Sequence, residues 1–169
     1  MPRYAALLRA VNVGGTGKLP MQELVAMCER AGFQEVRTYI ASGNAVFSSN
    51  LSAPVIKAAL ETQLETYAGK KITVFVRCSD ELAQVLADNP FAGEDPKKCA
   101  VVFLDDAPEQ ADLENARGVD CELFTPGRRE IYIFYPSGMG RSKLRIPVAE
   151  AGTARNMNTV AKLVEMTRS

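Results

Sequence analysis

The order of apolar and polar positions in the first third of the chain predicts a strand followed by a helix. Residues 3–11 are rich in apolar side chains and lead into glycines, which is typical of a buried strand that ends in a tight loop. After Pro20, apolar residues recur at helical spacing until Gly32 ends the helix. This apolar stripe consists of Met21, Leu24, Val25 and Cys28.

The next segment predicts a hairpin, a second helix and another strand. VRTYIA and AVFSS are two predicted strands joined at SGN, because Gly and Asn both tolerate positive φ. Ser52 is the predicted N-cap of a helix that ends at Gly69, and ITVFVRC then predicts a strand. The order β-α-β-β-α-β is the split βαβ plan of ferredoxin-like folds, in which helices cover one face of an antiparallel sheet.

The same plan restarts in the second half of the chain. A helix over about residues 79–89 and the breakers NPF and GEDP precede a strand in CAVVFLDD, a short helix in PEQADLENARG and a hairpin around TPGR. The second half then differs from the first. Where a final strand is expected, the chain has RSKLRIPVAEAG, TARNMN and a closing helix.

These patterns predict an α+β fold. We expect a tandem pair of ferredoxin-like (βαββαβ-type) subdomains with antiparallel sheets, related by duplication, with the second copy modified at its C-terminus. The expected boundaries are 1–89 for the N-terminal subdomain with its connecting helix and 90–169 for the C-terminal α+β subdomain. The short linker between them predicts that they pack as one compact family domain.

Composition and charge narrow the function classes. The chain is 47% hydrophobic and carries 20 basic and 20 acidic side chains, so its formal net charge is zero. No global field therefore draws it to nucleic acid or to an anionic membrane. No apolar run approaches the ~20 residues of a membrane span, and Arg9 interrupts the start too early for a signal peptide. We expect a cytoplasmic protein with no membrane partner.

The titratable residues exclude several kinds of catalysis. There is no histidine, and the four cysteines form no Cys-x-x-Cys pair, so we expect no zinc site, no other metal and no cofactor. Ser-His and Cys-His nucleophiles are excluded, and whether the protein is an enzyme stays open. Cys28 is predicted to be a small core residue. Asp105 and Asp106, at the end of an apolar strand, are the best metal-ligand or general-base candidates, although solvation is the simpler role.

The stretch GGTGK resembles a phosphate-binding loop but fails the test for a nucleoside-triphosphatase P-loop. Asn12 stands where the first glycine is required, and Leu19 stands where Ser or Thr would ligate Mg²⁺. Pro20 lacks the backbone N–H that a phosphate-cradling helix start offers. AVVFLDD mimics a Walker B strand, and without a valid P-loop we interpret it as a buried strand.

Four polar segments place cations, amides or hydroxyls beside glycines or helix starts: RAVNVGGTGK, SGN at 42–44, GMGRSK at 138–143 and RNMNT at 155–159. Glycine turns and helix N-termini present N–H groups to anions. Asn156 is a predicted N-cap, which leaves Arg155 and Asn158 to reach outward. If the four segments converge, the anion-binding residues are Arg9, Asn12, Gly14, Gly15, Lys18, Ser42, Asn44, Arg141, Ser142, Lys143, Arg155, Asn156 and Asn158. The alternative, that each residue serves only a turn or a cap, stays open.

Five motifs carry a family resemblance: LLRAVNVGGTGKLPMQEL, VRTYIASGNAVF, NPF, GMGRSKL and RNMNTVAKL. They resemble, in order, the signatures of the bacterial domain of unknown function 1697 family, from about Tyr4 to Val164. The resemblance implies two ferredoxin-like α+β subdomains and no assigned biochemical role, and it adds Gly43 and Gly140 to the matched positions. Met157 stands where tryptophan is common, which argues against base stacking there. Pro147 should break the helix expected after Lys143.

Three hypotheses for function remain. The first is a protein or enzyme that binds a phosphate-bearing small molecule, nucleotide-like in character, through the candidate residues above. The second, which the neutral charge disfavours, is an RNA- or DNA-binding module whose ferredoxin-like sheet stacks bases on aromatic side chains that face solvent. The third is a non-enzymatic interaction module or homodimer. The aromatic residues that the second hypothesis requires are Tyr39, Phe47, Tyr132 and Phe134.

Overall fold

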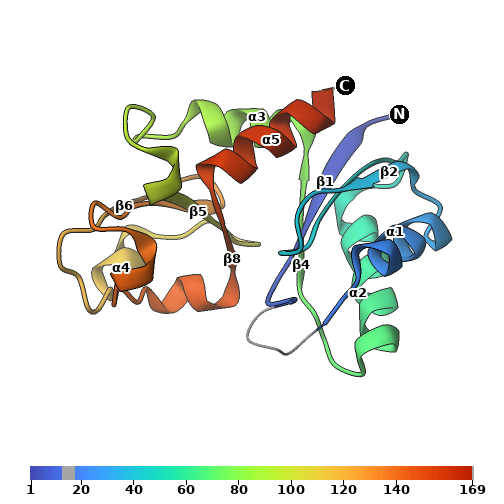
Figure 1. The fold of residues 1–169 in the computed structure, drawn as a ribbon, viewed down its shortest axis with the longest axis horizontal. Coiled ribbons are helices and arrows are strands. Elements are labelled where there is room, and N and C mark those ends of the chain that lie inside the picture. The colour runs from blue at the N-terminus through green and yellow to red at the C-terminus, as the bar shows by residue number, and fades with distance from the viewer. Residues whose placement is uncertain (13–17, 169) are drawn as a thin grey trace. The chain divides into compact units, whose positions relative to one another are not determined.

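The computed structural model describes residues 1–12 and 18–168. The chain divides into two compact units, of which unit 1 comprises Met1–Leu82 with Leu163–Ser169 and unit 2 comprises Ala83–Lys162. Each unit contains a four-stranded antiparallel sheet (Figure 1). The predicted α+β class is confirmed.

Unit 1 is built on the sheet order β2-β3-β1-β4, with antiparallel neighbours. Its strands are β1 (Arg3–Leu8), β2 (Gln34–Thr38), β3 (Asn44–Ser48) and β4 (Val74–Cys78). Its helices are α1 (Met21–Arg30) and α2 (Ala53–Ala68), and α3 (Ser79–Ala87) follows β4 directly. Apolar side chains of β1 such as Ala6 and Leu8 pack with Leu24 of α1 and Leu60 of α2 in one buried core. The helical stripes therefore cover one face of this sheet, as the sequence pattern predicts.

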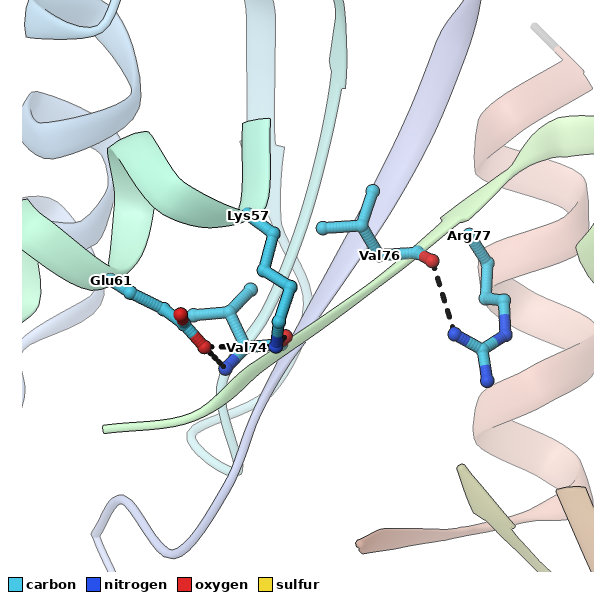
Figure 2. A network of polar contacts seen from close by, with 5 residues as sticks. All are labelled: Lys57, Glu61, Val74, Val76 and Arg77. Atoms are coloured by element: carbon cyan, nitrogen blue, oxygen red, sulfur yellow. Dashed lines mark hydrogen bonds and ion pairs between the residues drawn. The ribbon is translucent and has the colours of Figure 1, made fainter. Parts of the chain in front are cut away.

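Side chains of α2 cover the outer edge of β4, which is the last strand of its sheet (Figure 2). The Lys57 ammonium donates to the Val74 carbonyl, and the Val74 N–H donates to Glu61 Oε2 across 3.0 Å. Lys57 and Glu61 also pair with each other at 2.9 Å. Farther along the strand, Arg77 Nη1 donates to the Val76 carbonyl across 3.1 Å. These side chains occupy backbone groups that would otherwise be available to another strand.

Unit 2 has the sheet order β6-β7-β5-β8, again with antiparallel neighbours. Its strands are β5 (Cys99–Phe103), β6 (Leu123–Pro126), β7 (Glu130–Phe134) and β8 (Thr153–Asn156). Helix α4 (Gln110–Glu114) precedes β6, and helix α5 (Met157–Arg168) follows β8. Three short 3-10 segments are η1 (Pro96–Lys98), η2 (Met139–Arg141) and η3 (Pro147–Ala151). If the strands of each unit are numbered in chain order, both sheets have the same spatial order, 2-3-1-4.

The structure corrects the sequence prediction at the C-terminal end of unit 2. A fourth strand is present, because β8 pairs with β5 from Asn156 opposite Ala100 to Thr153 opposite Phe103. The pattern of apolar residues does not indicate this strand, because its buried positions carry Thr153 and Arg155 instead of apolar residues. The predicted interruption at Pro147 is confirmed, because only the 3-10 segment η3 forms there.

Candidate functional site

Asn12 joins the two ends of the glycine-rich segment in unit 1. Its Nδ2 donates to the Leu19 carbonyl across 2.9 Å, and its Oδ1 accepts from the Leu19 N–H across 2.8 Å. Nδ2 also donates to the Ala41 carbonyl across 2.7 Å. The Asn12 backbone has φ 55°, a conformation that Asn adopts more readily than most residues. Its amide therefore bonds backbone groups of Leu19 and Ala41.

The SGN turn is fixed in the same way. Asn44 is fully buried, and its Nδ2 donates to the Tyr39 carbonyl across 2.9 Å and to Ser42 Oγ across 3.1 Å. Gly43 has φ +93°, and a Cβ there would lie 2.7 Å from Val11 Cγ2 and 3.0 Å from Leu8 Cβ. Only glycine fits this turn without strain. Asn44, which we expected to present an amide to an anion, instead holds the turn.

Two cations of unit 1 stay exposed beside the segment that Asn12 closes. Arg9 lies just after β1, and Lys18 directly precedes Leu19, whose backbone Asn12 holds. The candidates Gly14 and Gly15 lie outside the described residues. Arg9 and Lys18 are therefore the members of the predicted unit 1 set whose side chains face solvent with a positive charge.

The GMGRSK segment of unit 2 is anchored by a carboxylate from a distant part of the chain. Ser142 Oγ donates to Glu122 Oε2 across 3.0 Å and accepts from the Leu144 N–H across 3.1 Å. Arg141 and Lys143, on either side of Ser142, are exposed, and neither has an ion-pair partner within the residues that the structure describes. The hydroxyl holds the loop, and the two cations are left available to solvent.

Hydrogen bonds stabilise the charged form of Glu122. The Asp120 N–H donates to Glu122 Oε1 across 2.8 Å and is the largest contribution that lowers the pKa of this carboxyl group. Burial opposes the shift, and the Ser142 hydroxyl lowers the pKa further. Glu122 therefore anchors Ser142 as a carboxylate at neutral pH.

A backbone bridge next to this loop was not predicted from the sequence. Arg117 N donates to the Arg145 carbonyl across 2.7 Å, and Arg145 N donates to the Arg117 carbonyl across 2.8 Å. Both side chains are exposed. The available signal was the alternation of charged and apolar residues in Lys143, Leu144, Arg145 and Ile146, which is typical of an extended segment with one face in the core.

The RNMNT segment divides into structural and exposed residues. Arg155 is only 6% exposed, and Nη1 donates to Thr153 Oγ1 across 2.7 Å and to the Ala154 carbonyl across 2.9 Å. Burial lowers its pKa to about 10. The expectation that Arg155 reaches outward is therefore wrong. Asn156 caps α5 as predicted, since its Oδ1 accepts from the Thr159 N–H across 2.9 Å, and Asn158 is exposed.

Two of the four aromatic side chains that the nucleic-acid hypothesis requires at the surface are buried. Phe47 is fully buried in the core of unit 1 against Phe33. Tyr132 is buried as well, and its hydroxyl donates to the Val85 carbonyl across 2.9 Å. Tyr39 and Phe134 are half-buried, and Phe134 packs against Phe91. The nucleic-acid hypothesis requires aromatic side chains that face solvent on the sheet, and Phe47 and Tyr132 do not face solvent.

The remaining candidates for chemistry are dispersed. Within residues 1–12 and 18–168, no cluster of three or more Cys, Asp or Glu side chains is arranged to hold a metal ion. Asp105 and Asp106 are exposed at the end of β5. Cys28 is fully buried, which confirms its predicted place in the core, and burial raises its pKa to about 12. No helix in the described part of the chain is both long and apolar enough to cross a bilayer.

Comparisons with known proteins extend the family resemblance. A family model described as "Protein of unknown function (DUF1697)" matches residues 1–132. A similar solved structure is that of the conserved bacterial protein SP0830 from Streptococcus pneumoniae, with a TM-score of 0.81 and 23% sequence identity over 98% of each chain. At this identity the likeness supports the fold alone. A comparison with curated proteins finds no match.

Proposed function

The chain belongs to the DUF1697 family of proteins of unknown function, as its motifs predict, and we propose that it binds a phosphate-bearing small molecule of nucleotide type. The observation that carries the proposal is the anchored loop of unit 2. Arg141 and Lys143 flank Ser142, whose hydroxyl is tied to Glu122 across 3.0 Å. The two cations thus project from a backbone that is fixed before a ligand arrives, which reduces the entropic cost of binding.

The chemistry of these side chains suits phosphate. The Arg141 guanidinium offers a planar fork of donors that bonds two phosphate oxygens at once, and the Lys143 ammonium contributes a point charge. Gly138 has φ +89°, and it brings the chain into the 3-10 segment η2 just before these residues. The amides and hydroxyls of the predicted set contribute by holding turns, so the proposed ligand contacts in unit 2 are mainly cationic.

Arg9 and Lys18 of unit 1 form a second, separate part of the proposal. Both are exposed beside the segment whose ends Asn12 joins. Exposed cations are the side chains that meet an anion most directly. Variants of these two residues test unit 1 independently of unit 2.

We also propose the finer fold assignment, a duplicated ferredoxin-like subdomain, with the strands of one copy within 1–89 and those of the other within 90–169. The shared strand order supports it, and so do two arginines at matching positions. Arg77 of β4 lies opposite Ala5, and Arg155 of β8 lies opposite Val101, each on the fourth strand and next to the middle of the first. Each guanidinium donates to the carbonyl of the residue before it.

A cytoplasmic location is part of the proposal as well. All four cysteines are free thiols, and free thiols are typical of reducing compartments. Nucleic-acid binding and a homodimeric interaction role are the alternatives, and the structure adds no observation that favours either one.

Thermal stability in the presence of nucleotides tests the proposed function. If phosphate groups bind at Arg141 and Lys143, one or more members of a panel of nucleoside mono-, di- and triphosphates will raise the Tm of the wild-type protein. Arg141→Ala with Lys143→Ala should abolish the increase, while Arg128→Ala, another exposed arginine of unit 2, should leave it unchanged. No increase with any nucleotide, or an equal increase in the double variant, would refute the proposed site.

A further inference from the structure

A second set of cations lies beside the anchored loop, on the backbone bridge between Arg117 and Arg145. Ala116, Leu144 and Ile146 point into the core of unit 2, and the residues that alternate with them are exposed. Directly opposed residues of an antiparallel bridge lie on the same face, and so do residues two positions apart in an extended segment. Arg117, Lys143 and Arg145 therefore share one outward face, which we call the cationic face.

The charges of the cationic face are poorly compensated. Arg117 and Lys143 have no ion-pair partner among residues 1–12 and 18–168. Arg145 approaches Glu150 only at 3.7 Å, and both side chains are largely exposed, so this pair contributes little. Like charges directly opposite each other across strands are destabilising. Both bridge positions nevertheless carry arginine, although a neutral residue at position 117 or 145 would remove the repulsion between the two side chains.

The cationic face is also held in place by close backbone contact. Gly118 has φ +68°, and a Cβ there would lie 2.1 Å from the Lys143 carbonyl oxygen. Only glycine permits this approach, which brings the residue after Arg117 against the backbone of Lys143. The bridge hydrogen bonds and this contact fix the backbone that carries the three cations.

We infer that the cationic face extends the proposed phosphate site and binds the additional phosphate of a ligand with two or more phosphate groups, such as a nucleoside di- or triphosphate. The inference rests on the proposed function at Arg141 and Lys143. Three guanidinium groups and one ammonium group offer more hydrogen-bond donors than the oxygens of a single phosphate group accept. Hydrogen-bonded partners across a bridge lie about 5.5 Å apart at Cα, so Arg117 and Arg145 reach a region wider than one phosphate group.

The test compares inorganic phosphate, pyrophosphate and tripolyphosphate by isothermal titration calorimetry on the full chain. We expect pyrophosphate to bind the wild-type protein at least about tenfold more tightly than phosphate. In Arg117→Gln with Arg145→Gln this gain should disappear, while the affinity for phosphate stays the same. Arg128→Gln serves as the control, and circular dichroism checks that each variant is folded.

The other outcomes separate the inference from the proposed function. If phosphate and pyrophosphate bind equally, or if the double variant keeps the gain, the inference is wrong and the phosphate site remains. If none of the three anions binds, both are wrong. If single-stranded oligothymidylate binds more tightly than tripolyphosphate and depends on the same arginines, the face is a nucleic-acid surface and the inference is overturned.

Discussion

The Ser142 hydroxyl donates a hydrogen bond to Glu122 Oε2 across 3.0 Å, although the two residues are 20 positions apart in the sequence. This bond joins the loop before β6 to the loop after β7, and it fixes the residue between Arg141 and Lys143. The Glu122 carboxylate thereby holds the backbone that carries the two cations.

The anchoring role of Glu122 predicts a pH dependence of stability. Because the folded-state pKa lies below the ordinary value of 4.5, Glu122 contributes stability above that pH and loses its contribution as the pH falls through the lowered pKa. Glu122→Gln should therefore be less stable than the wild-type protein at neutral pH, with a difference that shrinks as the pH falls below 4.5. Urea unfolding of both proteins across this range measures it. A difference that does not change with pH would contradict the role.

Asn12 is predicted to stabilise unit 1 through its side chain. Asn12→Gly tolerates the positive φ but leaves both backbone groups of Leu19 and the Ala41 carbonyl without these partners. We expect the free energy of unfolding to fall by about 1–3 kcal/mol. Lys18→Ala, at an exposed neighbouring position, should change it by less than about 0.5 kcal/mol. If Asn12→Gly is as stable as the wild-type protein, the three bonds do not support the segment.

The sequence predicts the helices and most strands because their apolar residues follow helical or alternating periods. It does not predict β8, since Thr153 and Arg155 occupy the inward positions where apolar residues are expected. For the same reason the sequence places Arg155 among outward-reaching ligands. The sequence alone does not distinguish a buried arginine from an exposed one. The pairing of β8 with β5 shows that Arg155 lies in a strand, where it is buried.

The sequence identifies the polar residues beside each turn but does not show whether a side chain bonds the chain itself or faces solvent. Asn44, Asn156 and Ser142 each bond the chain itself, because a short polar side chain beside a turn reaches backbone groups more easily than a ligand. Arg117 and Arg145 were missed because the bridge that aligns them joins segments far apart in the sequence. The alternation around Arg145 indicates an extended segment but not the segment with which it pairs.

Arg155 and Arg141 should respond differently to the same substitution. Arg155 is 6% exposed and bonds Thr153 Oγ1 at 2.7 Å, so Arg155→Ala should lower the free energy of unfolding by about 1–3 kcal/mol. Arg141 is exposed, and Arg141→Ala should lower it by less than about 0.5 kcal/mol. Denaturant unfolding at neutral pH measures both variants. An equal decrease in the free energy of unfolding for the two variants would show that Arg155 is no more important for stability than Arg141.

Lys57 and Glu61 are predicted to keep the β4 edge from pairing with another chain. Replacing both residues with alanine removes these side-chain partners from both backbone groups of Val74. Since an open edge is a template for strand addition, we expect concentration-dependent self-association in sedimentation velocity. Glu65→Ala, at an exposed position on the same helix, is the control and should stay unchanged. A double variant that behaves like this control would show that the edge is protected in another way.

Identification of small molecules that remain bound to the purified protein is a direct test of phosphate binding at Arg141 and Lys143. The wild-type protein and the variant with Arg141→Ala and Lys143→Ala are purified in parallel, denatured, and their released compounds identified by mass spectrometry. With no tryptophan and five tyrosines, a bound nucleotide base will also stand out in the absorbance at 260 nm relative to 280 nm. We expect a phosphate-bearing compound from the wild-type protein and none from the variant. The same compound in equal amount from both proteins would show that Arg141 and Lys143 do not bind it.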